Sequence, residues 1–363
     1  MTTQLTLRSL RSTAVVVPMA RPLGTSAQTM RSAPLLLIDL ETEEGVTGRA
    51  YLFCYLPAAA ASIARMLDEA QRVIAGKPAA PQEIGVALAR HFRLLGARGI
   101  VSMALAGIDV ACWDALAVAA GLPLATLLGS TPKAIPAYNS NGLGLMAPEA
   151  AADEAEALVA EGFGAIKMRL GRSTAAADLA AVRAVRARLA DDTALMVDFN
   201  QALGLNEARR RGRALDGEGV YWIEEPIRHD DYAGNAALAR ELDTPIQIGE
   251  NFAGPQAMAT AIAAQVADFM MPDLERIGGV SGWQRAAALA GAAGIEMSSH
   301  LFPEASAHLL AATPTAHWLE YVDWANAILV EPLKIVDGHA QVSTTPGSGV
   351  AWDEAAVARY RVD

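Results

Sequence analysis

Cysteine and histidine are scarce in this chain of 363 residues, which has two cysteines and six histidines. Cys54 and Cys112 both lie in apolar stretches. Isolated apolar cysteines fit small buried thiols in a reducing compartment better than a disulfide framework. We therefore expect a cytoplasmic protein without disulfides.

Positive charge and long apolar runs are lacking as well. The net charge is −11 and the sequence pI is about 5.1, which argues against a nucleic-acid partner because phosphate binding requires a clustered cationic face. No stretch approaches the roughly 20 apolar residues of a membrane span. The apolar run Val15–Val17 near the start is short, and Pro18 interrupts it, so a first strand is expected there and not a signal peptide. The sequence predicts no membrane partner.

The hydrophobic content of 52% is ample for a large core. The first third of the chain has strand-like runs and then helical patterns, which predicts a small α+β domain. Residues 21 to 29 form a polar segment that we expect to be a loop too long for a tight hairpin, of the kind that often covers a binding site. The expected strands are 4–18, 33–41 and 46–54, and the expected helices are 57–75, 82–93 and 99–119.

From about residue 135 the pattern changes to short apolar runs that alternate with alanine-rich helical segments. This alternation predicts a closed parallel (β/α) barrel of the TIM type. We expect the barrel to span residues 131–324, and an α+β capping domain to comprise residues 1–130 completed by 325–363. The eight expected barrel strands are 136–139, 164–169, 194–199, 220–224, 246–249, 268–271, 295–299 and 317–320.

Three carboxylates end consecutive predicted strands of this barrel. Asp198, Glu224 and Glu250 are separated by 26 residues each time (224−198 and 250−224), which is about the length of one βα unit. The carboxyl ends of barrel strands meet at one mouth, where active sites are built. Three converging carboxylates repel one another unless a cation lies between them, and oxygen ligands suit Mg²⁺. The sequence therefore predicts a magnesium site.

Further polar side chains end the remaining strands. Lys167 and Arg169 are two residues apart on one strand and thus project to the same side. Asp273 and His300 end neighbouring strands, and a carboxylate that binds one imidazole nitrogen orients the ring as a general base. A divalent ion, a lysine and this pair predict removal of the proton next to a substrate carboxylate, with stabilisation of the enediolate that forms.

These residues resemble the mandelate racemase subgroup of the enolase superfamily. The segments that carry the resemblance are Ala33–Leu40, Val220–Pro226, Pro272–Asp273 with Ile277–Val280, Met297–Phe302 and Ser306–Glu320. The resemblance covers the whole chain. It implies a Mg²⁺-dependent enzyme that acts on a small carboxylate and assembles as a homo-octamer or another homo-oligomer.

The resemblance also implies a role for each matching residue. Asp198, Glu224 and Glu250 become the Mg²⁺ ligands, Asp273 with His300 the base, Glu320 the acid that binds the substrate carboxylate, and Lys167 a further contact to it. The segment from Arg21 to Thr29 matches the specificity lid. The substrate contacts implied are Ser140, Asn200, Tyr55, Arg21 and Thr25.

One position departs from the family pattern. The second lysine of the Lys-x-Lys motif, which is the base on the opposite face of the substrate, is Arg169 here. Deprotonating an arginine at neutral pH costs about 8 kcal/mol for a pKa near 13, and its planar fork suits carboxylate binding better than proton exchange.

Three functions remain open from the sequence. The first is a racemase or epimerase of a 2-hydroxy acid, and the second is a dehydratase of a polyhydroxy acid in which Arg169 is only a positive charge. The resemblance of the whole chain favours the first, which we rank ahead of the second, whereas Arg169 and the polar lid favour the second. The third is a metal- and carboxylate-binding protein without catalysis.

Overall fold

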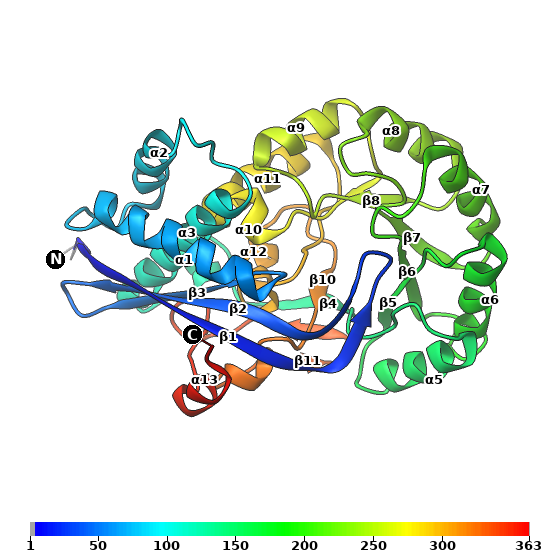
Figure 1. Ribbon diagram of the computed structural model, residues 1–363, viewed down its shortest axis with the longest axis horizontal. Helices are drawn as coiled ribbons and strands as arrows, with labels where there is room; N and C mark the ends of the chain where they lie inside the picture. Colours follow the sequence, from blue (N-terminus) through cyan, green and yellow to red (C-terminus); the bar gives the residue numbers. More distant parts are fainter. Residues whose placement is uncertain (1–3, 363) are drawn as a thin grey trace.

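The computed structural model describes residues 4–362, in a sheet-and-helix cap joined to a barrel (Figure 1). The cap has an antiparallel sheet in the order β1–β2–β3. Its three longer helices begin and end within two residues of the sequence prediction, and the short α4 was not predicted. Its elements are β1 (Leu7–Gly24), β2 (Thr29–Thr42), β3 (Thr47–Phe53), α1 (Pro57–Ile74), α2 (Pro81–His91), α3 (Ile100–Ala120) and the short α4 (Leu124–Leu127).

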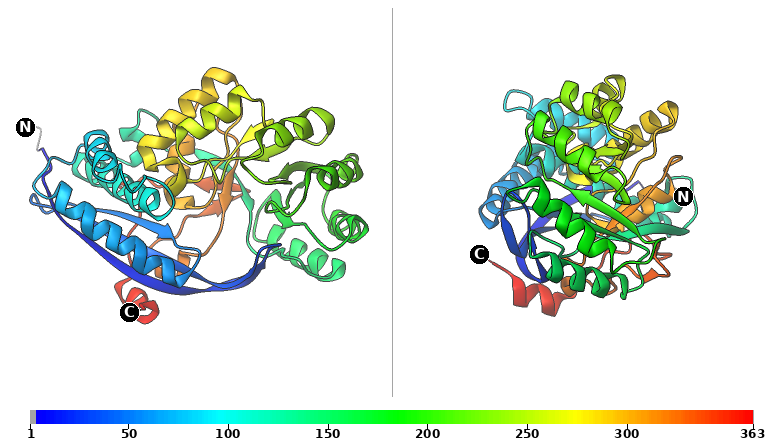
Figure 2. Two further views of the ribbon diagram at one scale, coloured as in Figure 1. Left: turned by 45° about the horizontal axis from the view of Figure 1, so that its top comes forward. Right: turned by 90° about the vertical axis from the view of Figure 1, so that its right-hand side faces the viewer.

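The predicted loop at residues 21–29 is wrong. β1 continues to Gly24, β2 starts at Thr29, and the turn between them is closed by a hydrogen bond from the Thr25 amide to the Gln28 carbonyl at 2.9 Å. This arm extends beyond the cap sheet toward the barrel mouth (Figures 1 and 2). At its tip the Ser26 hydroxyl donates to the Phe199 carbonyl at 3.2 Å. An arm without a continuous buried face needs no apolar alternation, so its strands were not visible as a hydrophobic pattern.

The barrel is a parallel sheet that closes where β10 pairs with β4. The predicted strand at 295–299 forms only isolated bridges, from Met297 to Met270 and Ala316, and is not a regular strand. The strands are β4 (Ala134–Asn139), β5 (Ala165–Arg169), β6 (Ala194–Asp198), β7 (Val220–Glu224), β8 (Ile246–Ile248), β9 (Phe269–Met270) and β10 (Leu319–Tyr321).

Helices cover the outside of the barrel (Figure 2). They are α5 (Pro148–Val159), α6 (Ala175–Arg186), α7 (Leu205–Leu215), α8 (Tyr232–Glu241), α9 (Pro255–Ala263), α10 (Leu274–Ile277), α11 (Gly279–Ala293) and α12 (Pro303–Ala311). Local chemistry sets where they start. Proline occupies the first turn of α5, α9 and α12, and the side chains of Thr174 and Asp231 accept backbone hydrogen bonds at the starts of α6 and α8.

The core of the cap is α3, which packs on β3 and α1. Gly48 permits this approach, because a Cβ there would lie 2.0 Å from the Ala111 carbonyl oxygen. Among residues 4–362, α3 is the one helix long and apolar enough to cross a membrane by composition, contrary to the sequence expectation that no stretch comes close. Since 72% of its most apolar window is buried inside the structure, α3 has the surroundings of a core helix.

The C-terminal segment contacts both parts of the molecule. It contains η1 (Asn326–Ile328), β11 (Ile335–Val336), β12 (His339–Gln341) and α13 (Glu354–Tyr360). β12 pairs antiparallel with barrel strand β4. On the cap side, the Trp352 indole donates to Asp39 at 2.9 Å and the Ser348 amide donates to Asp114 at 2.6 Å. The division at residues 130 and 324 stays a prediction.

Candidate active site

The three predicted metal ligands lie at the barrel mouth on adjacent strands. Asp198 and Glu224 are the last residues of β6 and β7 and are direct register partners. Glu250 follows the end of β8 by two residues. All three side chains are largely enclosed, with Glu250 the most accessible at 16%. The structure thus brings these carboxylates to one region, as the strand spacing predicts.

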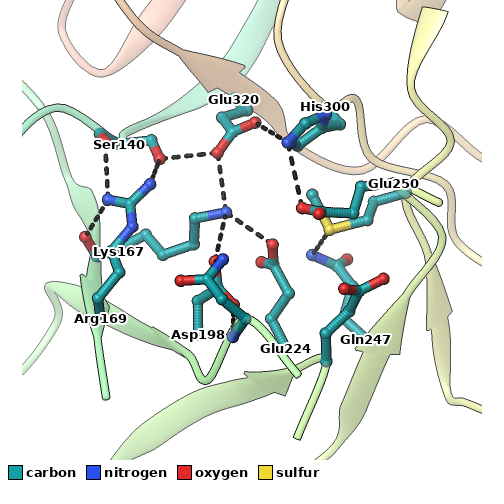
Figure 3. A network of polar contacts seen from close by, with 12 residues as sticks. Ser140, Lys167, Arg169, Asp198, Glu224, Gln247, Glu250, His300 and Glu320 are labelled. Carbon is teal, nitrogen blue, oxygen red and sulfur yellow. Dashed lines mark hydrogen bonds and ion pairs between the residues drawn. The ribbon is translucent and has the colours of Figure 1, made fainter. Parts of the chain in front are cut away.

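Lys167 of β5 lies among these carboxylates (Figure 3). Its Nζ is 2.7 Å from Glu224 Oε1, 2.8 Å from Glu320 Oε1 and 3.7 Å from Asp198 Oδ2. Burial alone would lower the pKa of Lys167, but the attraction of these three acids outweighs burial and raises it. The ammonium group is therefore a fixed counter-ion and not a proton acceptor.

The donor set fits a hard divalent cation, although no closed cage is formed. Among residues 4–362, no three acidic, histidine or cysteine side chains enclose an ion-sized point. Burial raises the pKa of Glu224 to about 8, and repulsion from Asp198 and Glu250 adds to this against the opposing effect of Lys167. Carboxylates that disfavour one another's charge in a buried site are the ligands that a divalent cation stabilises. The Asn200 carboxamide oxygen beside them is buried and has no partner.

Asp273 and His300 form the predicted pair. His300 Nδ1 donates to Asp273 Oδ2 at 2.6 Å. The other oxygen of Asp273 accepts from the amides of Glu275 and Arg276 at 2.8 and 3.1 Å, because Asp273 caps the start of α10. Both oxygens are thus held, and the orientation of the imidazole is fixed through Nδ1.

The second imidazole nitrogen is left for chemistry. His300 Nε2 lies 3.2 Å from Glu250 Oε2 and 3.8 Å from Glu320 Oε2 (Figure 3). Burial opposes protonation of His300, but these two acids and the hydrogen bond to Asp273 raise its pKa well above the ordinary value. This raised pKa of His300 is that of the protein without a bound cation. His300 lines the cavity at the barrel mouth.

The Arg169 side chain forms hydrogen bonds to neighbouring groups of the protein. Its Nη1 donates to the carbonyl of Ser140 at 2.8 Å and, more weakly, to those of Gly142 and Lys167 at 3.3 and 3.4 Å. Its Nη2 donates to the Ser140 hydroxyl at 2.8 Å. The guanidinium is buried, with 4% of the residue exposed. Both terminal nitrogens of this planar fork thus have acceptors supplied by the protein.

Glu320 is held as a carboxylate on the far side of Lys167. It accepts from the Ser140 hydroxyl at 2.7 Å and from the Leu301 amide at 3.0 Å. Burial would raise the pKa of Glu320, but Lys167 and His300 outweigh burial and hold it below the usual range. In this arrangement Glu320 is an acceptor and a negative charge beside the base.

A cavity of about 240 Å³ lies between the hairpin arm and these residues. Three of the five expected substrate contacts line it, namely Thr25, Tyr55 and Asn200. The other two do not. Arg21 forms an ion pair with Glu161 at 2.6 Å, because an arm residue next to the barrel rim finds a carboxylate there. Ser140 lies behind the cavity wall, where it holds Arg169 and Glu320.

Several cavity residues were missed from the sequence. Gln201, Asn251, Arg276 and Trp324 line the cavity together with Met30 and Phe53. A signal was available for two of them, since Asn251 directly follows the strand-end Glu250 and Arg276 lies one helical turn after Asp273. Gln201 and Trp324 come from loops whose course no periodic pattern indicates, whereas Met30 and Phe53 lie on the cap strands β2 and β3.

The chain is similar to known proteins along its length. The model described as "Mandelate racemase / muconate lactonizing enzyme, N-terminal domain" matches residues 8–129, and "Enolase C-terminal domain-like" matches 150–356. The L-talarate/galactarate dehydratase of Salmonella typhimurium strain LT2 is 32% identical over 347 residues, which are 94% of this chain and 87% of the relative. Other relatives are named as cycloisomerases, dehydratases and epimerases.

Two solved structures are more similar still. An enolase from the alpha proteobacterium BAL199 with bound magnesium is 48% identical, with a TM-score of 0.97 over 99% of this chain and 100% of that one. An enolase from Bradyrhizobium in complex with magnesium and mandelic acid is 44% identical, with a TM-score of 0.95 over the full length of both chains.

Proposed function

Since this chain belongs to the mandelate racemase/muconate lactonizing enzyme family of the enolase superfamily, we propose that it is a Mg²⁺-dependent dehydratase of a small polyhydroxy acid. Members of this family related to this chain are isomerases and hydro-lyases. The reaction begins with removal of the proton next to the substrate carboxylate. A hydroxyl on the following carbon then leaves as water.

Asp198, Glu224 and Glu250 are the residues that would hold Mg²⁺, the cofactor with which structural neighbours are crystallised. Their oxygen donors and mutual repulsion support this assignment. When bound, Mg²⁺ supplies positive charge that stabilises the substrate carboxylate and the negative charge developing on it. Lys167 is placed to add a second positive charge beside the same ligands.

His300 takes the proton through Nε2, while Asp273 stabilises the imidazolium that results. The electrons of the broken C–H bond form the enediolate. Their return expels the neighbouring hydroxyl as the C–O bond breaks, and His300 gives its proton to this leaving group, so that water departs. The enol that remains tautomerises to a 2-keto acid. Lys167 and Glu320 orient the reacting carboxylate.

The observation that carries dehydration over racemisation is the hydrogen bonding of Arg169. Racemisation needs a group on the opposite face of the substrate that accepts and returns a proton. Arg169 occupies the family position for that group, but its terminal nitrogens donate to Ser140 and to backbone carbonyls. Dehydration needs only one base, and His300 supplies it.

A racemase or epimerase of a 2-hydroxy acid is the second candidate, and it is the function that the sequence resemblance alone ranks first. The observation in its favour is the 44% identical structure that binds mandelic acid. Aromatic side chains on the cap side of the cavity, Phe53, Tyr55 and Trp324, suit such a substrate. The two candidates differ in product, because racemisation loses no water.

The test is an assay of the Mg²⁺-loaded protein on a panel of aldonic, aldaric and aryl 2-hydroxy acids. Formation of a 2-keto acid is followed as its semicarbazone, and loss of optical activity is followed in parallel. We expect keto-acid formation that disappears in His300→Asn and persists in His91→Asn, a change at a distant, partly exposed histidine. Inversion without keto acid would replace this proposal with the racemase.

A further inference from the structure

Arg276 is a cation of the catalytic cavity that forms no ion pair within residues 4–362. Lys167 is paired with acids at 2.7 and 2.8 Å, and the Arg169 terminal nitrogens are bound to Ser140 and carbonyls. Arg276 also lines the cavity and is only partly buried. Within residues 4–362, no carboxylate oxygen lies within 4.0 Å of its guanidinium. Its guanidinium has five N–H donors. In the part of the chain that the structure describes, one of them is engaged in a hydrogen bond to the protein.

That hydrogen bond fixes the position of Arg276. Its Nη1 donates to the Asn251 side-chain oxygen. Asn251 is itself held, because its Nδ2 donates to both oxygens of Glu225 at 2.9 and 3.0 Å and to Glu250 at 3.1 Å. Asn251 therefore links Arg276 to a predicted Mg²⁺ ligand. A guanidinium anchored at one nitrogen by a partly buried side chain that is itself held by hydrogen bonds loses little conformational entropy when it binds a ligand.

Tyr55 of the cap supports the opposite side of the group. The Arg276 guanidinium carbon lies 4.9 Å from the centre of the Tyr55 ring. Stacking uses the face of the guanidinium, whereas its hydrogen bonds lie in the plane, so both can be made together. Burial would lower the pKa of Arg276, but Tyr55 and the nearby acids, which include Asp273 and Glu250, outweigh burial and raise it. The result is a fixed, charged fork with donors left for a ligand.

Arg276 lies where two cavities meet. It lines a second cavity of about 340 Å³ between the cap helices α2 and α3 and the barrel, as well as the catalytic cavity. The group therefore lies at the edge of the catalytic cavity, with open volume on both sides. This volume leaves room beside Arg276 for a substrate that extends beyond its reacting carbons.

We propose that Arg276 binds a second carboxylate of the substrate, so that the enzyme prefers hydroxy diacids to monoacids of the same configuration. This rests on the proposed function for the reacting end of the molecule. A planar fork pairs with a carboxylate through two parallel hydrogen bonds. An aldaric acid offers this group at the chain end, where the matching aldonic acid has a hydroxymethyl group.

The experiment compares aldaric acids with aldonic acids of the same configuration on the Mg²⁺-loaded enzyme. We expect kcat/KM for the diacid to exceed that for the monoacid at least tenfold. Arg276→Met lowers the diacid value at least ten times more than the monoacid value, mainly through KM, and Arg276→Lys restores part of the difference. Arg285→Met is the control, because Arg285 is exposed and lines only the neighbouring cavity; it leaves the ratio unchanged.

Binding without turnover separates this inference from the proposed function. Adipate and hexanoate lack the hydroxyl groups needed for reaction, and their affinities for the Mg²⁺-loaded His300→Asn protein are measured by calorimetry. Tighter binding of adipate that is lost in His300→Asn/Arg276→Met supports the subsite, even if no acid is dehydrated. Equal affinity for the two probes, or equal loss on diacid and monoacid in Arg276→Met, overturns it even if dehydration is found.

Discussion

The Ser140 hydroxyl accepts from Arg169 Nη2 at 2.8 Å and donates to Glu320 Oε1 at 2.7 Å. The hydroxyl of Ser140, the residue after β4, thus joins a cation from β5 to the Glu320 carboxylate of β10. The Ser140 carbonyl takes a second bond from Arg169 at 2.8 Å. Arg169 therefore supports Glu320 from behind and is charged while it does so.

The first prediction concerns Asp273. Asp273→Asn keeps the size of the side chain but removes the charge that stabilises a protonated His300, and it changes the tautomer that the imidazole adopts. We expect a loss of kcat on the order of 10³-fold or more. The same substitution at the exposed Asp192, far from the site, should have no effect. Activity of Asp273→Asn within tenfold of the parent would show that this pair is not the base.

The second prediction concerns magnesium. Because buried acids repel one another in the apo protein, Mg²⁺ should stabilise the fold by about 2.7 kcal/mol at 100 times its dissociation constant. Thermal unfolding with Mg²⁺ and with EDTA measures this as a shift of several degrees. In Asp198→Asn the shift should shrink strongly. If the unfolding temperature of the parent protein were the same with Mg²⁺ and with EDTA, the assigned ligand set would be contradicted.

The third prediction concerns pH and the buried His308. Its Nδ1 accepts from the Ala125 amide at 3.1 Å, and burial lowers its pKa to about 4. In the unfolded chain His308 takes up a proton near its ordinary pKa. The contribution of neutral His308 to the free energy of unfolding is therefore fully present above about pH 6.5 and is lost as the pH falls toward 4.

The size of this effect is about 2 kcal/mol between about pH 7.5 and about pH 5. Urea unfolding at the two pH values measures it. His308→Gln should lose less stability on acidification than the parent by that amount, whereas His339→Gln, at an exposed site, should match the parent. An equal acid sensitivity of His308→Gln and parent would show that His308 is not held neutral.

The fourth prediction concerns the contact between β3 and α3. Gly48→Ala would place a Cβ 2.0 Å from the Ala111 carbonyl oxygen and 2.8 Å from the Ala115 Cβ. We expect a loss of about 3 kcal/mol or more in the free energy of unfolding, because backbone must move. Gly85→Ala in α2 meets no atom within 4 Å and should stabilise by up to about 1 kcal/mol. Equal stabilities of the two variants would refute the close approach.

The sequence predicted the parts of the fold that follow a hydrophobic period. Barrel strands such as Val220–Glu224 are buried on both faces and appear as apolar runs, so their ends could be placed within two residues. The hairpin arm at Pro18–Thr29 and the segment around Met297 could not be placed, because one leaves the core and the other is held by isolated bridges.

The residues of the site also fall into those that the sequence could predict and those that it could not. Residues at strand ends, such as Asp198, Glu224 and Asp273, could be predicted to converge because topology alone brings them together. Contacts that depend on loop paths and rotamers could not, as the pairing of Arg21 with Glu161 and the position of Arg276 show. The expected homo-octamer or other homo-oligomer stays a prediction, since no interface was visible in the sequence.

The most direct test of the central claim follows the fate of the substrate α-carbon in D₂O. The Mg²⁺-loaded enzyme is mixed with each candidate acid, and products are identified by NMR and mass. With the terminal nitrogens of Arg169 bound to Ser140, we predict loss of water to a 2-keto acid, and unreacted substrate whose α-carbon keeps its configuration. Recovery of an inverted, α-deuterated acid of otherwise unchanged composition would show proton transfer on both faces and contradict the account.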